Sequence, residues 1–138
     1  MPNPETIFSN EIRHALEALG AMVFKVHGHG MQESGWPDLQ VYHPQWTGHI
    51  ETKVGDRNCT TGQKLKIRDL RQRNTHAIVV RLSGGRITAE DEDCCELAYI
   101  SPDSWRFTKG NTRGNALMEL FHLACSELEK RAGYHGRP

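Results

Sequence analysis

The chain has 138 residues, a length typical of a single domain with one hydrophobic core rather than two. Its 17 Lys and Arg residues balance 17 Asp and Glu residues, and 37% of its residues are hydrophobic, which is typical of a water-soluble globular domain. No apolar run is long enough to span a membrane, and the N-terminus does not resemble a signal peptide, so we expect a cytoplasmic protein without a membrane partner.

Hydrophobic periodicity predicts the elements of the first 54 residues. Apolar residues recur at helical spacing from residue 5 to 19, which predicts an amphipathic helix that ends at Gly20. Short apolar runs predict three strands, and a glycine-rich run predicts a loop after the first of them: 21–26, 38–42 and 49–54, with the loop at 27–35. The last two strands have a short linker and should form an antiparallel hairpin, which would bring Asp38 near Glu51.

The second half of the chain begins with a predicted basic helix, 61–74, and a strong strand, 76–82. Helix followed by strand after a hairpin indicates a crossover, so we expect a mixed sheet with helices on its faces. The helix should bury Leu65, Ile67 and Leu70. The remaining expectations are a short edge strand at 86–88, a solvated loop or first helical turn at the acidic block 90–93, marginal strands at 97–100 and 105–108, and an amphipathic helix at 116–131 that could cover the sheet or a second subunit.

The two hairpin strands carry residues suited to phosphodiester hydrolysis. This chemistry uses a hard divalent cation held by oxygen ligands, and Asp38 and Glu51 would supply two carboxylates. The carbonyl oxygen of Thr52 could supply a third ligand. Strand alternation puts Lys53 on the same side as Glu51, where it could orient water or stabilise negative charge on the phosphate. The alternative is an exposed sheet face on which Glu51 and Lys53 form an ordinary surface pair.

A larger pattern surrounds these residues. It consists of Gly35-x-Pro37-Asp38-Leu39, Ile50-Glu51-x-Lys53, Lys25-Val-His-Gly28, Gln32-x-x-Gly35 and Thr60-x-x-Gln63. The pattern resembles the PD-(D/E)XK nuclease superfamily and, within it, the VRR-NUC family, many of whose small members are encoded by phages. The resemblance covers residues 5–82. It implies a restriction-endonuclease-like α/β fold, with a mixed central sheet flanked by helices.

The resemblance also implies a set of site residues. Asp38 and Glu51 would hold Mg²⁺, for which Mn²⁺ would substitute, Lys53 would be the catalytic lysine, and a glutamate of the first helix would complete the site. Either Glu5 or Glu11 could be this glutamate. They cannot occupy the same place, because six residues correspond to about 120° around a helix after full turns are removed.

Two further sets of residues have competing interpretations. Gln63 could act in the site, or it could form a capping box with Thr60 at the start of the basic helix. The basic side chains of that helix could contact the DNA backbone, or they could simply be solvated. These candidate DNA contacts are Lys64, Lys66, Arg68 and Arg71, and Lys25 is a further candidate at the edge of the site.

The sequence therefore predicts one nuclease domain, 1–138, in which residues 83–138 are an extension for packing or dimerisation. Its predicted activity is Mg²⁺-dependent hydrolysis of DNA that leaves 5′-phosphate and 3′-hydroxyl ends. The resemblance implies branched DNA, such as a Holliday junction, or duplex DNA as substrate, a homodimer, and the bacterial host cytoplasm as location if the protein is encoded by a phage. The alternative is a catalytically inactive nuclease-fold module for DNA binding or phage assembly.

Overall fold

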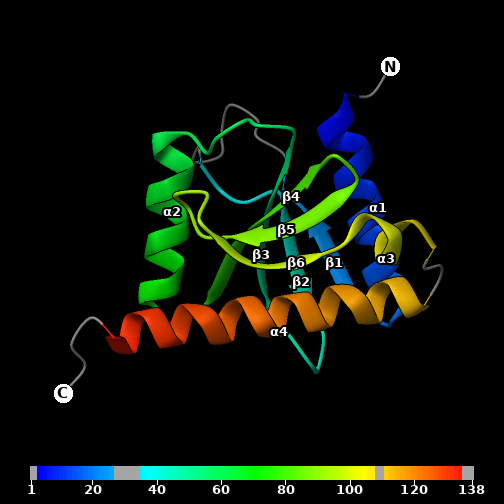
Figure 1. Cartoon of the computed structure of the whole chain (residues 1–138). Helices are drawn as coiled ribbons and strands as arrows, with labels where there is room; N and C mark the ends of the chain where they lie inside the picture. The colour runs from blue at the N-terminus through cyan, green and yellow to red at the C-terminus, as the bar shows by residue number, and fades with distance from the viewer. Residues whose placement is uncertain (1–2, 27–34, 108–110, 135–138) are drawn as a thin grey trace.

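The computed structural model describes residues 3–26, 35–107 and 111–134 (Figure 1). Their helices and strands follow one another in the order α1 (Pro4–Ala18), β1 (Met22–Lys25), β2 (Leu39–Tyr42), β3 (Gly48–Val54), α2 (Thr61–Gln72), β4 (His76–Ser83), β5 (Arg86–Glu90), β6 (Glu96–Ile100), α3 (Pro102–Phe107) and α4 (Asn111–Tyr134). Most of the predicted loop at 27–35 lies outside the described residues. Within them, no helix combines the length and the apolar character that crossing a bilayer requires.

All six strands form a single sheet in the order β1-β2-β3-β4-β5-β6. Neighbouring strands are antiparallel except β3 and β4, which run parallel over the whole of β3. A parallel pair needs a crossover connection, and α2 lies within that connection. The structure thus confirms the predicted hairpin of β2 and β3, the crossover, and the mixed α/β fold with helices around a central sheet.

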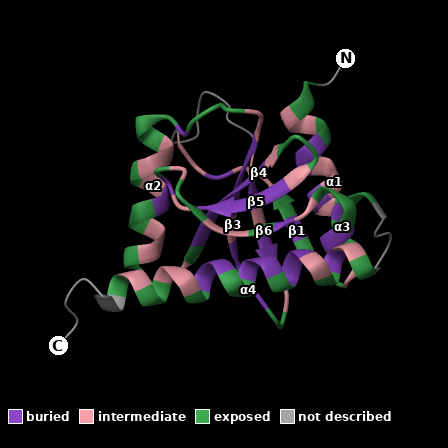
Figure 2. Ribbon diagram, in the orientation of Figure 1, coloured by how far each residue is buried: buried purple, intermediate pink, exposed green. Residues whose placement is uncertain are grey.

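Helices α1 and α2 lie on opposite sides of the sheet (Figure 2). On one face, α1 and α4 close the main hydrophobic core, which includes Ile50, Ile78 and Val80. On the other face, α2 packs over β4, where Ala77 and Val79 form a second small core with residues of α2. Side chains alternate along β4, so one strand supplies both cores. Candidate site residues on β3 share the face of the second core.

Helix α1 begins as local chemistry predicts. The side chain of Asn3 accepts a hydrogen bond from the backbone N–H of Thr6 (2.8 Å), and Pro4 occupies the first helical turn.

Helix α1 crosses α4 closely at Gly114, where a Cβ atom would lie 2.5 Å from the carbonyl oxygen of Ala15. Only glycine therefore allows this approach of the two helices.

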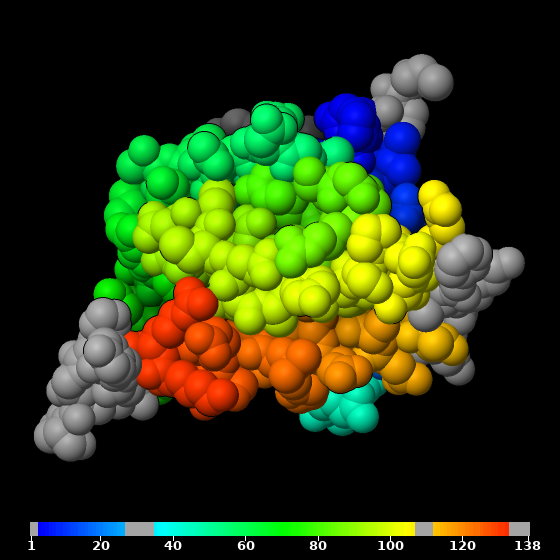
Figure 3. All heavy atoms as spheres, viewed as in Figure 1, coloured from blue at the N-terminus to red at the C-terminus, as the bar shows by residue number. Residues whose placement is uncertain are grey.

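Helix α4 is longer than predicted and packs within its own chain. Its apolar stripe, including Leu117, Leu120, Phe121 and Ala124, is buried in the main core. In the space-filling view the helix, orange to red, lies directly against the yellow and yellow-green atoms of β5, β6 and α3 (Figure 3). The expectation that this stripe could cover the sheet is confirmed, so the same side chains are not available to a second subunit.

Two expectations for residues 86–108 are wrong. Strand β5 is not an edge strand, because β6 pairs with its outer side. Residues 105–107 of the predicted strand 105–108 belong instead to helix α3, and residue 108 lies outside the described residues. Pro102 in the first position favours this helix, and the hydroxyl oxygen of Ser101 accepts a hydrogen bond from the backbone N–H of Ser104 (3.3 Å).

Two expectations about burial are also wrong. Leu65 is 57% exposed, because Ile67 and Leu70 are the side chains that α2 turns toward the sheet. The acidic block is not simply solvated, since Glu90 and Glu92 are buried. Each of these two carboxylates pairs with arginine, which permits its burial.

Candidate active site

The two predicted motifs meet at the start of β2. The hairpin register pairs Leu39 with Ile50, so Asp38, one residue before β2, approaches Glu51. Glu51 and Lys53 are only 2% and 3% exposed. The alternative of an ordinary surface pair is therefore wrong for these two residues.

Asp38 is held in place by Thr52 of β3. Its Oδ2 atom accepts a hydrogen bond from the backbone N–H of Thr52 (2.9 Å) and another from the Thr52 hydroxyl (2.6 Å). These two contacts orient the carboxylate from both the main chain and a side chain. The motif pattern assigns only a carbonyl oxygen to position 52 and gives no signal for the contact made by the hydroxyl.

Gln63 links the first turn of α2 to the residues of β3. Its Oε1 accepts hydrogen bonds from the Thr60 backbone N–H (2.9 Å) and from Lys53 Nζ (3.1 Å). Its Nε2 donates to Glu51 Oε2 (3.2 Å), and its own backbone N–H donates to Thr60 Oγ1 (3.2 Å). The capping box is therefore present, and the same side chain also contacts both charged groups on β3.

Gly35 allows the chain before Asp38 to pack against this same helix end. Its φ of +91° lies in the region that favours glycine. A Cβ atom at Gly35 would also lie 2.6 Å from the carbonyl oxygen of Gly62. The glycine of the Gly-x-Pro-Asp pattern thus has a structural reason, which is the close contact with the first turn of α2.

The surroundings of Glu51 disfavour its ionised form. Burial raises the pKa of Glu51 to about 8, and the negative charge of Asp38 adds to this effect. Lys53, whose Nζ lies 3.6 Å from Glu51 Oε2, lowers the pKa but does not offset the other two contributions. The second oxygen, Oε1, is buried without a hydrogen-bond partner. The protein alone therefore stabilises the ionised carboxylate poorly.

The two candidate glutamates of α1 face different parts of the molecule. The charge of Glu5 contributes to the raised pKa of Glu51, and Glu5 Oε1 lies 3.2 Å from a guanidinium nitrogen of Arg57. Glu11 instead lies 3.9 Å from Arg113 of α4. The structure thus brings Glu5, not Glu11, close enough to Glu51 to affect its ionisation. Arg57 was not among the predicted site residues.

The donor chemistry of this cluster fits a divalent cation. Mg²⁺ and Mn²⁺ prefer carboxylate oxygens, and the unpartnered Oε1 of Glu51 is such an oxygen beside the charge of Asp38. Asp38, Glu51 and Glu5 do not, as they lie, place three ligand atoms within 4.8 Å of one another. For all three carboxylates to bind one cation, their side chains would therefore have to move closer together.

Among the described residues, Asp91, Glu92 and Asp93 do have ligand atoms that close together. Glu92 and Asp93 pair with arginines of α2, so their negative charge is already balanced by the protein. This acidic group therefore stabilises the fold and is not a second candidate centre.

The predicted DNA-contacting side chains are engaged within the chain. Lys64 lies 3.7 Å from Asp93, while Arg68 and Arg71 pair with Glu92. Lys66 lies over the ring of Trp36. The side chain of Lys25, at the end of β1, reaches α1, where its Nζ lies 3.4 Å from Asn10 Oδ1. Their roles in DNA binding remain predictions, and phosphate would have to compete with these internal partners.

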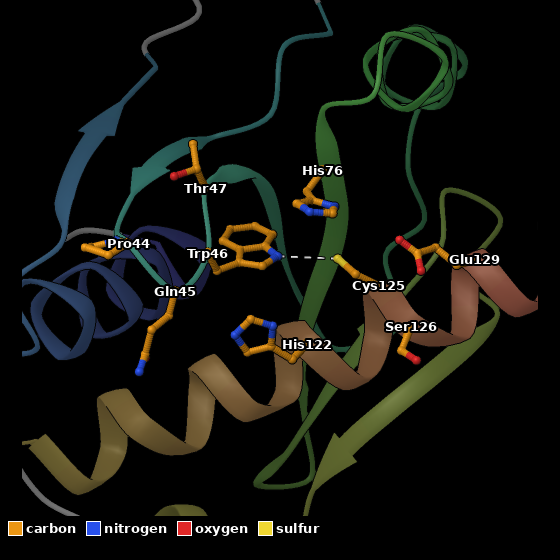
Figure 4. Close-up of a pocket in the computed structure, with 9 residues that line it drawn as sticks. All are labelled: Pro44, Gln45, Trp46, Thr47, His76, His122, Cys125, Ser126 and Glu129. Carbon is orange, nitrogen blue, oxygen red and sulfur yellow. Dashed lines mark hydrogen bonds between the residues drawn. The ribbon is translucent and has the colours of Figure 1, made fainter.

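A separate hollow of about 480 Å³ lies between the β2–β3 turn and α4 (Figure 4). The Trp46 ring stacks on His76 at 5.8 Å, and its Nε1–H donates to Cys125 Sγ (3.4 Å). Burial raises the pKa of the Cys125 thiol, which keeps it protonated. These contacts attach the turn to α4, and none of the predicted site residues lines the hollow.

Comparisons with known proteins add little. No family model matches the chain, and no curated protein matches it. The structure is similar to that of Hjc, a Holliday junction resolvase from the archaeal hyperthermophile Archaeoglobus fulgidus, with a TM-score of 0.49 and 18% sequence identity. The similarity covers 61% of this chain and 75% of the other. A similarity this distant assigns no role to any residue of this chain, and the resemblance to the VRR-NUC family remains a prediction.

Proposed function

We propose that this protein is a divalent-metal-dependent endonuclease that hydrolyses phosphodiester bonds in DNA. The observation that carries the proposal is the buried Glu51 carboxylate, which has one unpartnered oxygen, a neighbouring negative charge from Asp38 and a raised pKa. A folded protein gains nothing in stability from this arrangement without a cation. Perturbed ionisable groups of this kind are typical of functional sites.

In this proposal Asp38, Glu51 and Glu5 hold the cation, together with the carbonyl oxygen of Thr52. The cation, Mg²⁺ or Mn²⁺, supplies Lewis acidity at the phosphate and lowers the pKa of water. The ammonium group of Lys53 stabilises the negative charge that develops on the phosphate. Gln63 positions Lys53 through the hydrogen bond between Lys53 Nζ and Gln63 Oε1.

The finer features of the proposal follow the resemblance to small VRR-NUC nucleases. They are a branched DNA substrate, such as a four-way junction, and cleavage by a homodimer that cuts two strands and leaves 5′-phosphate ends. The buried stripe of α4 cannot form the dimer contact, so another surface would have to do so.

A cleavage assay tests the activity. Plasmid and four-way-junction DNA are incubated with the native protein, Asp38→Ala and Lys53→Ala in Mg²⁺, Mn²⁺ or EDTA. We expect metal-dependent cutting by the native protein, a loss of about 10²–10³ in rate for Lys53→Ala, and no cutting by Asp38→Ala. Cutting that survives both substitutions would show that the site lies elsewhere.

A matched pair of variants tests the ligand set. Glu5→Gln and Glu11→Gln are the same change on the same helix, but only Glu5 affects the charge at Glu51. We expect Glu5→Gln to weaken Mn²⁺ binding, measured by titration calorimetry, by at least about tenfold, and Glu11→Gln to leave it unchanged. Equal binding by both variants would remove Glu5 from the ligand set.

The second candidate function is a nuclease-fold module that binds DNA without cutting it. The internal pairing of Lys64, Arg68 and Arg71 does not favour this alternative, because those cations would be its main phosphate contacts. Metal-independent DNA binding without cleavage of either substrate would support it.

A further inference from the structure

Three large side chains are exposed together on β1 and β2. Met22, Phe24 and Tyr42 are 59%, 52% and 45% exposed. Much of the β1 ribbon is green in Figure 2, which is the colour of exposed residues. The register pairs Met22 with Tyr42, and the rings of Phe24 and Tyr42 meet edge to face at 6.0 Å. We call these three residues the aromatic patch.

The fold does not need the aromatic patch. The opposite side of the same two strands supplies Val23, Leu39 and Val41 to the main core. Helix α2 packs over β4 on the face of the patch, and β1 is the edge strand. Clustered apolar side chains on an uncovered face mark a binding surface more often than a packing requirement.

The aromatic patch lies on the same face of the sheet as the candidate active site. Phe24 is opposite Gln40, and Gln40 is opposite His49, which shares its side of β3 with Glu51. Phe24 is therefore about 7 Å along the strands from Asp38, which is close to the rise of two stacked nucleotides. A DNA strand in the site can reach the patch with its next bases.

A second aromatic group lies nearer the site. The ring of Trp36 is 5.9 Å from that of His49, and Lys66 Nζ lies 4.6 Å above the Trp36 ring. Aromatic faces with a nearby cation are the usual means of binding single strands without sequence preference. The patch continues this series of rings away from the carboxylates.

The patch is too small to hold a second copy of the chain. Large side chains bury about 150–250 Å² each, so three that are half exposed offer on the order of 300 Å². A stable dimer needs about 800 Å² from each partner. A pair of nucleobases has the matching size, and bases are accessible to such stacking only where they are unpaired.

We propose that the aromatic patch stacks on unpaired bases of a DNA strand whose phosphodiester lies at Asp38 and Glu51. This inference rests on the proposed nuclease function and adds to it a preference, among branched substrates, for DNA with an unpaired segment beside the cleaved bond. A flap or a single-strand to double-strand boundary has this form, whereas fully paired duplex does not.

The test compares binding of a fluorescent poly-dT oligonucleotide with that of a paired duplex in EDTA, by anisotropy. The double variant Phe24→Leu with Tyr42→Leu keeps the apolar character but removes both rings. Tyr99→Leu is the control for loss of an exposed ring far from the carboxylates, because Tyr99 is 56% exposed on the same face of the sheet at its opposite edge. We expect the double variant to bind the single strand at least about tenfold more weakly than the native protein does. Tyr99→Leu should bind the single strand like the native protein, and both variants should bind the duplex like it.

Several results would overturn the inference. Undiminished single-strand binding by the double variant, or an equal loss in Tyr99→Leu, would do so. Light scattering that shows a native dimer and a monomeric double variant would assign the patch to a second copy. Cleavage of a flapped duplex in Mg²⁺ separates failure of this inference from failure of the nuclease proposal. At saturating protein the double variant should still cut this substrate, because its carboxylates are intact, whereas Asp38→Ala should not.

Discussion

Two glutamates of the sheet region are buried to nearly the same extent, but their pKa values are shifted in opposite directions. Glu51 on β3 is 2% exposed and Glu92, just after β5, is 6% exposed. Burial alone would raise the pKa of both groups. For Glu92, a hydrogen bond from Arg68 (2.8 Å) and the charge of Arg71 outweigh burial, so its pKa lies below the usual value.

Glu51 has no such compensation. Its cation, Lys53, also donates a hydrogen bond to Gln63, and the other charges that shift its pKa are the negative ones of Asp38 and Glu5. Burial by itself therefore does not distinguish a structural carboxylate from a functional one. The distinguishing feature is whether the protein supplies enough positive charge and hydrogen-bond donors to the buried oxygens.

The largest expected effect concerns a compensated pair. The guanidinium of Arg81 is buried, and it binds Glu90 at 3.0 Å and the carbonyl oxygens of Gly55 and Arg57. Glu90→Gln leaves this buried cation without its counter-ion, so we expect a loss of about 3–5 kcal/mol in the free energy of unfolding. Urea denaturation measures this loss.

Glu96→Gln is the control, because Glu96 pairs with Arg86 across an exposed part of the same sheet edge. We expect a loss of less than about 1 kcal/mol for this variant. If both variants lost the same stability, burial would not be what makes the Arg81 pair important.

The next effect has the opposite sign. In the folded protein the pKa of Glu51 is about 8, above its ordinary value of 4.5, so protonation of Glu51 stabilises the fold. This contribution is fully present below pH 4.5 and is lost as the pH rises through about 8. We therefore expect Glu51→Gln to raise the stability of the metal-free protein by about 2 kcal/mol at pH 9 and hardly at all at pH 5.

Thermal denaturation in EDTA at the two pH values measures this difference. Glu92→Gln should destabilise the protein at both, because it removes the partner of two arginines. A Glu51→Gln variant that is less stable than the native protein at pH 9 would contradict the inference that ionised Glu51 destabilises the metal-free fold.

The sequence was sufficient for the features that depend on short spacing. Alternation in residues 49–54 places Glu51 and Lys53 on one side, and a short linker determines the hairpin that brings Asp38 to them. The capping box of Thr60 and Gln63 is likewise local. Each of these predictions needed only a strand period, a turn length or a three-residue spacing.

Features that depend on distant parts of the chain could not be predicted in this way. Arg68 and Glu92 are 24 residues apart, and the acidic block resembled a solvated segment because its arginine partners are on another element. The choice between Glu5 and Glu11 depends on how α1 and α4 pack, since α4 supplies the Arg113 that lies near Glu11. Helical spacing alone showed only that the two glutamates face different ways.

The smallest expected effect tests whether the protein orients Asp38 as firmly as the arginines orient Glu92. Thr52→Val removes the 2.6 Å hydroxyl contact and keeps the backbone N–H contact and the shape of the side chain. We expect metal-dependent cleavage to fall about tenfold, equivalent to about 1.4 kcal/mol, with a parallel loss in Mn²⁺ affinity. Thr52→Ser should restore both, and Thr88→Val, at a buried threonine of β5, should change neither. A loss of thermal stability without a change in Mn²⁺ affinity would mean that the hydroxyl supports the fold rather than the carboxylate, because orientation of a ligand oxygen acts on cation binding directly.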